Sequence, residues 1–99
     1  MRGVLLAQAN LTAADLSAAY LPSALLGGAI LHQSCLQAAN FWQADLRGAD
    51  LQGAILHNAI FYETRFDEST VLPDGQRWSA ALELARFTDP AHPEFWYVI

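Results

Sequence analysis

The chain repeats every five residues over most of its length, and this period excludes the ordinary secondary structures. On an α-helix, steps of five advance around the axis by about 140°, which would scatter the recurring residues over every side. A regular strand requires a period of two. Large apolar residues occupy every fifth position, namely Leu6, Leu11, Leu16, Leu21, Leu26, Leu31, Leu36, Phe41, Leu46, Leu51, Leu56, Phe61, Phe66 and Val71. Two residues before each of them lies a second column, mostly alanine: Val4, Ala9, Ala14, Ala19, Ala24, Ala29, Ser34, Ala39, Ala44, Ala49, Ala54, Ala59, Thr64 and Ser69.

The spacing within one unit predicts the short side of a coil. The small and the large residue are two apart and face inward, as on a strand, with one outward residue between them. The remaining two residues turn the corner, and successive coils stack in parallel at about 4.8 Å. Each buried Leu or Phe then stabilises the axis by roughly 1.5–3 kcal/mol before chain entropy is subtracted.

Five units carry a more specific signature. They are Ala9-Asn10-Leu11, Ala14-Asp15-Leu16, Ala39-Asn40-Phe41, Ala44-Asp45-Leu46 and Ala49-Asp50-Leu51, and they resemble the A-(D/N)-L-x-x repeat of the pentapeptide-repeat family. The resemblance implies an all-β fold, a right-handed quadrilateral parallel β-helix in which residues twenty apart stack. Residues 72–78 and 87–96 resemble the tail that follows the repeats in cyanobacterial members. We therefore predict a β-helix of about three and a half coils over residues 4–71, and a capping turn, short helix and tail over residues 72–99.

The Asn or Asp before each central residue is predicted to accept a hydrogen bond from local backbone at the turn, rather than to act as a catalytic acid.

The two ends of such a solenoid need covering, because a terminal coil exposes core and an unpaired edge. After a turn at residues 73–75, Ser79 is predicted to cap a helix from Ala80 to about Phe87. The predicted C-terminal cap consists of Trp78, Leu82, Phe95 and Trp96. The N-terminal end is predicted to be open at Leu6, Leu11 and Leu16. We expect this end to stack on a second copy or on another repeat protein, the alternative being that a few disordered residues cover it.

Outward apolar residues form the second candidate surface. An aromatic face carries Tyr20, Trp42, Ile60 and Tyr62, and an apolar band around the second coil includes Leu25 and Ile30. Exposed apolar patches mark interfaces, and Trp and Tyr are common anchors. The alternative is that the C-terminal tail folds back and covers this face.

Chemistry-bearing groupings are missing from the repeat pattern. The sequence has no outward Ser-His-Asp set, glycine-rich phosphate loop or pocketed carboxylate pair, and a filled β-helix offers no cavity. Cys35 and His57 share one face without a third ligand, so neither a metal site nor a cofactor is predicted. We expect a protein that is not an enzyme and has no small-molecule substrate.

The charge and the apolar runs limit the remaining partners and the compartment. The net charge of −5 argues against nucleic-acid binding, which uses a basic surface. The longest apolar run, residues 24–31, is too short to span a membrane. The single cysteine suits a reducing compartment, and the repeat explains the signal-like start, so a cytoplasmic location is predicted.

Two functions from different classes follow. The first is a non-catalytic protein-interaction scaffold that binds a protein partner or associates with itself. The second is taken from the family resemblance, since some members imitate duplex DNA and bind DNA gyrase. The carboxylates of this chain form no continuous column, and Arg47 and Arg65 interrupt them, so the scaffold is favoured.

Overall fold

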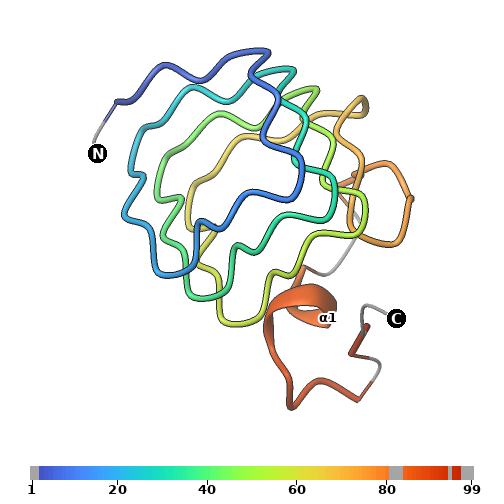
Figure 1. Ribbon diagram of the computed structural model, residues 1–99. Helices are drawn as coiled ribbons and strands as arrows, with labels where there is room; N and C mark the ends of the chain where they lie inside the picture. The colour runs from blue at the N-terminus through green and yellow to red at the C-terminus, as the bar shows by residue number, and fades with distance from the viewer. Residues whose placement is uncertain (1–2, 81–83, 94, 97–99) are drawn as a thin grey trace.

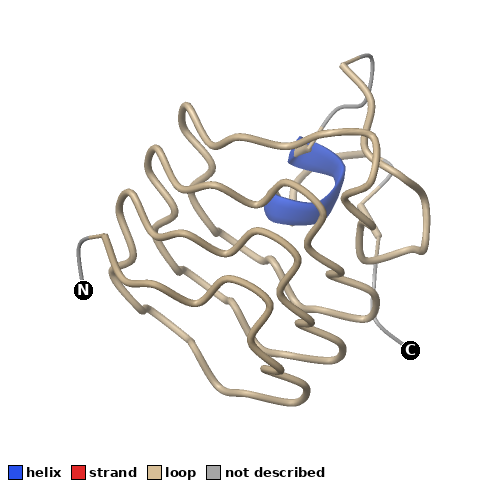
Figure 2. Cartoon of the chain, turned by 90° about the horizontal axis from the view of Figure 1, so that it is seen from above, coloured by secondary structure: helices blue, strands red, loops and turns tan. Residues whose placement is uncertain are grey.

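The computed structural model describes residues 3–80, 84–93 and 95–96, and it winds the repeats into stacked coils (Figures 1 and 2). Parallel bridges join residues twenty positions apart, in four columns that we number as sides 1 to 4. In order, these columns are Leu5–Leu25–Asp45–Arg65, Asn10–Ile30–Asp50, Asp15–Cys35–Ile55 and Tyr20–Asn40–Ile60. Within the described residues each side contributes one paired residue, so single bridges hold the coils together in place of longer strands. The twenty-residue stacking expected from the family resemblance is confirmed.

A tight turn joins each side to the next. The N–H of the small inward residue donates to the C=O three positions earlier, as from Ala9 to Leu6 at 3.0 Å. The residue at the third turn position has a φ between 55° and 74° at every described corner from Gly3 to Glu63, and this left-handed conformation is that of a type II turn. Most of these corners hold residues other than glycine, for example Ala38 at φ 61°. Coil stacking therefore imposes a conformation that the local sequence disfavours.

The Asn and Asp side chains support these turns as the sequence predicts. The Oδ1 atom of Asn10 accepts a hydrogen bond from the Thr12 N–H at 3.1 Å. Asp15, Asn40, Asp45 and Asp50 each accept one from the N–H two residues later. These oxygens have structural partners in the turn.

Side chains of the two inward columns fill the interior of the coils, as the sequence pattern predicts. The Leu residues from Leu21 to Leu51 in the large column are fully buried, and so are the alanines from Ala24 to Ala49 in the small column. The rings of Phe41 and Phe61 stack on each other with centroids 5.3 Å apart and planes 1° apart. Ser34, the polar member of the small column, donates its hydroxyl to the Leu31 carbonyl at 2.7 Å.

The repeat gains one residue in the last coil, and the predicted columns are wrong there. Val71 does not point into the core: it bridges Asp50, one position beyond the regular twenty. Leu72 takes the central position and Thr70 the small inward one, both fully buried, while Ser69 is exposed.

Two side chains accommodate the extra residue. The Asp67 carboxylate accepts hydrogen bonds from the N–H groups of Ser69 at 2.9 Å and Gly48 at 3.1 Å. The buried Thr70 hydroxyl donates to the Leu46 carbonyl at 2.9 Å. The bulged segment thus stays hydrogen-bonded to the preceding coil.

The chain reverses after this side. A turn at residues 73–75 is closed by the Leu72 N–H, which donates to the Gln76 carbonyl at 2.7 Å. Arg77 then forms an antiparallel bridge with Val71. The edge of the last coil on side 2 is therefore paired with a strand of opposite direction.

In the described residues that follow, the helix α1 (Ala85–Thr88) lies beside the last coils (Figure 1). The predicted start of this helix is wrong, because Ser79 and Ala80 are not helical and α1 begins after Leu84, which makes no side-chain cap bond. Predicted cap residue Leu82 lies outside the described residues. Phe87 of α1 is buried in the core cluster. This tertiary contact, rather than local helix propensity, determines where the helix lies.

Candidate interaction surfaces

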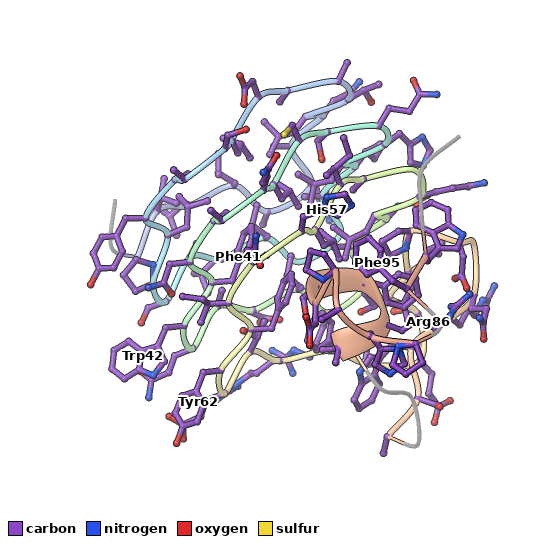
Figure 3. The ribbon with its side chains drawn as sticks, turned by 90° about the horizontal axis from the view of Figure 1, so that it is seen from below. Phe41, Trp42, His57, Tyr62, Arg86 and Phe95 are labelled. Atoms are coloured by element: carbon purple, nitrogen blue, oxygen red, sulfur yellow. The ribbon has the colours of Figure 1, made fainter. Side chains whose placement is uncertain are left out.

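The aromatic face lies on side 4 and on the corner that follows it. Tyr20 and Ile60 are outward residues of side 4, with 59% and 47% of their surface exposed. Trp42 and Tyr62 occupy the corner in adjacent coils, where Tyr62 is 65% exposed and Trp42 is half-buried. Figure 3 shows Trp42 and Tyr62 projecting outward beside each other, away from Arg86 and Phe95. We call Tyr20, Trp42, Ile60 and Tyr62 the aromatic wall.

The two predicted residues of the apolar band are on different sides. Leu25 lies on side 1, around the corner from the aromatic wall, and is 44% exposed. Ile30 lies on side 2, which is opposite side 4 in a four-sided coil. The structure therefore groups Leu25 with the aromatic wall and separates Ile30 from it.

Leu5 is an exposed residue that the sequence reasoning missed. It is 74% exposed and stacks beside Leu25 on side 1. The signal was present, because Leu5 occupies the same outward position as Leu25 in the five-residue unit.

The described part of the tail docks elsewhere than on the aromatic wall. The Phe95 ring lies beside the His57 ring (Figure 3), and the two ring centroids are 4.8 Å apart. The Asn58 N–H donates to the Thr88 carbonyl at 2.6 Å, so the end of α1 provides an acceptor for the coil. Tyr20, Ile60 and Tyr62 keep their exposure with this tail in place, which contradicts the alternative that these described tail residues cover the wall.

Two predicted cap residues contact the coils, and a third packs against α1. Trp78 stacks on Phe66 with centroids 5.9 Å apart, and Phe95 lies beside His57. Trp96 meets the Phe87 ring edge-on at 6.1 Å.

Phe87, which the prediction placed only at the end of the helix, is the buried ring of this region, at 1% exposure. The guanidinium of Arg86 lies 5.1 Å from the centre of that ring and binds the Asp74 carboxylate at 2.8 Å. α1 is thereby tied to the turn at residues 73–75.

The first coil is less enclosed than the coils after it. Leu6, Leu11 and Leu16 are half-buried and pack against the core cluster, whereas Leu26 and Leu31 in the second coil are fully buried. The predicted difference in enclosure between the first coil and the rest is present, and the use of this end for association stays a prediction.

Comparison with known proteins agrees with this architecture. The family model for pentapeptide repeats matches in 8 copies over residues 1–33 and 34–70. The chain belongs to the pentapeptide-repeat family. Comparison with curated proteins gives no significant match.

Two solved pentapeptide repeat proteins are similar to this one. Rfr23 of the cyanobacterium Cyanothece 51142 is 40% identical, with a TM-score of 0.68, over 69% of this chain and 46% of that protein. A protein of the Arabidopsis thaliana thylakoid lumen is 26% identical, with a TM-score of 0.64, over 71% of this chain and 51% of that protein. This chain thus spans about half the length of each of these two proteins. Members of the family form right-handed β-helices and are generally structural or interaction proteins rather than enzymes.

The carboxylates of this pentapeptide repeat protein are held in local bonds. A hydrogen bond from the Arg47 guanidinium lowers the pKa of the Asp45 carboxyl below its ordinary value. Burial raises the pKa of Asp74, but hydrogen bonds from Arg86 and Gln76 outweigh burial, and the net pKa is lowered.

The described residues contain no group of three or more His, Cys, Asp and Glu side chains placed to hold a metal ion. A hollow of about 470 Å³ is lined by Phe66, Asp67, Glu68, Ser69 and Trp78. The Asp67 carboxylate there is already bonded to backbone N–H groups. Among the described residues no helix is long and apolar enough to cross a membrane.

Proposed function

We propose that this pentapeptide repeat protein is a non-catalytic interaction module that binds a protein partner through its aromatic wall. The observation that carries the proposal is the exposure of Tyr20, Ile60 and Tyr62 on side 4 and its following corner while the described tail docks elsewhere. Aromatic rings held on a fixed backbone lose little conformational entropy on binding, which makes them effective anchors.

The stacking of the outer faces favours this function over DNA mimicry. Asp45 lies between Leu25 and Arg65 in its column, and Asp50 lies between Ile30 and Val71. Neither carboxylate stacks on another acidic side chain, whereas imitation of duplex DNA requires charge repeated along the rod.

We further propose that the residues after Leu72 act as a cap for the last coil. Three contacts support this role: the antiparallel bridge from Arg77 to Val71, the buried Phe87 ring, and the bond from the Asn58 N–H to Thr88. They cover an edge and a core that would otherwise meet solvent.

Affinity capture from the native cell tests the aromatic wall. The paired substitution Ile60→Ser and Tyr62→Ser is expected to abolish capture of the partner, because it removes the two most C-terminal anchors of the wall. Ile30→Ser is the matched control, since Ile30 is also exposed but lies on the opposite side. Equal capture by the wall variant and the control would remove the basis for this surface.

A further inference from the structure

The hollow of about 470 Å³ lies beside the bulged corner of the last coil. Two segments of the chain form it, because Trp78 follows the turn at residues 73–75 and the other lining residues precede that turn. A volume of this size is within the range of ligand-binding pockets in proteins. We call this feature, lined by Phe66, Asp67, Glu68, Ser69 and Trp78, the Trp78 hollow.

The extra residue of the last coil supplies the polar part of this lining. A regular corner holds two residues between the large inward residue of one side and the small inward residue of the next. The bulged corner holds three, namely Asp67, Glu68 and Ser69. Insertions into one unit of a repeat protein form loops on one face, which is often the binding face. The departure from the repeat therefore coincides with the hollow.

Aromatic rings form the rest of the lining. Trp78 stacks on Phe66 with centroids 5.9 Å apart, and Phe66 in turn contacts Phe61 at 5.7 Å. Trp78 ends this row of three rings and makes no further ring contact within the described chain. It is half-buried, so part of its indole is accessible to a ligand. Among aromatic side chains, the indole is the one that attracts cations most strongly.

Both carboxylates of the hollow have oxygens available to a ligand. The hydrogen bonds that Asp67 accepts within the described residues all end on its Oδ1 atom, which leaves Oδ2 without one. The hydrogen bond from the Ser69 hydroxyl lowers the pKa of Asp67, so this group stays ionised. Glu68 is exposed and forms no hydrogen bond or ion pair with a described residue.

The neighbouring cations do not neutralise these two carboxylates. The guanidinium of Arg47 binds Asp45 instead, through Nε at 3.0 Å and Nη2 at 2.7 Å. Arg65 is an exposed residue of side 1 and does not line the hollow. The lining of the Trp78 hollow thus has two negative charges and no positive one.

These features favour a guanidinium group over other ligands. A guanidinium is a planar cation that stacks on aromatic rings and donates several N–H bonds to carboxylates. An anion would be repelled by Asp67 and Glu68, and an apolar group would cover their oxygens without supplying a donor. An ammonium group is more strongly hydrated and has no flat face to stack on an indole.

We propose that the Trp78 hollow binds an arginine side chain of a protein partner, with the guanidinium against Trp78 and its N–H groups donating to Asp67 and Glu68. The proposal goes beyond the aromatic wall, because it assigns a second surface with a different chemistry at the corner after side 1. The two proposals can fail separately. The Ile60→Ser and Tyr62→Ser variant is expected to bind arginine as the wild type does.

An NMR titration of the folded chain with N-acetyl-arginine amide tests the site, because this probe presents a guanidinium without a charged terminus. The chain has three tryptophans, and the variants Trp42→Phe and Trp96→Phe assign their indole N–H signals. We expect the Trp78 signal to shift and to saturate with a dissociation constant on the order of 1 mM. The signals of Trp42 and Trp96 are expected to stay in place.

Glu68→Gln is the diagnostic variant, because this exposed side chain makes no bond that holds the coil. We expect it to weaken binding of the probe about fivefold. Glu63→Gln changes the net charge equally at an exposed carboxylate outside the hollow, and it is expected to leave the constant unchanged. N-acetyl-citrulline amide keeps the shape of the probe without its charge, and we expect no Trp78 shift with it.

A Trp78 signal that stays in place up to about 50 mM probe would overturn the proposal. So would equal constants for Glu68→Gln and Glu63→Gln, or a Trp42 signal that shifts in parallel, since the probe would then contact any accessible ring. Equally tight binding of N-acetyl-lysine amide would overturn the choice of a guanidinium. Tighter binding of free arginine than of the blocked probe would identify the amino acid as the ligand and overturn the assignment to a protein partner.

Discussion

Replacing Phe87 by alanine tests whether the C-terminal residues stabilise the coils. α1 has only four residues, too few to be stable alone, so its position depends on packing. The Phe87 ring is 1% exposed, belongs to the core cluster, and contacts Trp96 and the Arg86 guanidinium. Truncation of a ring buried to this extent costs about 3–5 kcal/mol.

This loss is large for a chain of this size. Domains are stable by only about 5–15 kcal/mol, and each 1 kcal/mol shifts the melting temperature of a 60–100-residue domain by about 4–8 °C. We therefore expect Phe87→Ala to melt at least about 12 °C below wild type if cap and coils unfold together.

Urea unfolding followed by tryptophan fluorescence measures the free-energy change, because Trp78 and Trp96 both lie in the capping region. Phe95→Ala is the matched control: its ring is only half-buried, against His57, and a smaller loss is expected. A Phe87→Ala loss below about 1 kcal/mol would refute the reasoning, since the ring would then contribute no more than a surface residue.

Three further changes test the coil geometry and its charges. Gly53→Ala is expected to lower the free energy of unfolding, measured in urea, by about 1–2 kcal/mol. Gly53 has a φ of +74°, and the new Cβ would lie 3.2 Å from the Cγ atom of Gln33 in the preceding coil. The folded-state pKa of Asp74 is lowered, so its ionised form stabilises the fold above pH 3.8 and this contribution is lost as the pH falls through the folded pKa. The difference in unfolding free energy between wild type and Asp74→Asn should therefore shrink below about pH 4; a gap that stays constant would contradict this. Deletion of Ser69 is expected to leave the melting temperature within a few degrees, about the effect of 1 kcal/mol, because it returns the bulged side to the five-residue period. Deletion of Gln43 breaks that period in a regular coil and should abolish cooperative melting; similar behaviour of the two deletions would count against the register.

The interior of the coils could be predicted from the sequence because one constraint repeats at every unit. Leu26 and Ala29 each have the size that the bore admits, and each inward position carries the same information. The role of the polar turn residues could also be predicted, since Asn and Asp side chains such as those of Asn10 and Asp15 commonly accept hydrogen bonds from local backbone at turns.

The inserted residue could not be found in the same way. Ser69 and Val71 satisfy the small-and-large pattern, and so do Thr70 and Leu72 one position later. The hydrogen bonds of the folded chain distinguish the two registers, since the Thr70 hydroxyl donates to the Leu46 carbonyl only when Thr70 is the inward residue. A hydrogen bond between residues so far apart in the chain leaves no periodic trace.

The helix was misplaced for a related reason. A serine followed by an apolar and alanine-rich stretch favours a helix from Ala80 by local propensity. The observed helix instead lies where Arg86 reaches Asp74 and Phe87 enters the core. These contacts outweigh a propensity difference of less than about 1 kcal/mol per residue.

The same distinction indicates where the function of this chain is encoded. The repeat determines every inward position, so a change there alters stability before it alters recognition. The outward positions are free of that constraint, and nothing in the coil requires Tyr62 or Leu5 to be large and apolar, since Glu63 and Arg65 are accepted at neighbouring exposed positions. Exposed apolar side chains lower solubility unless they are covered. Under the proposed function a protein partner covers the aromatic wall, and substitution at its positions should separate binding from folding more cleanly than any change in the core.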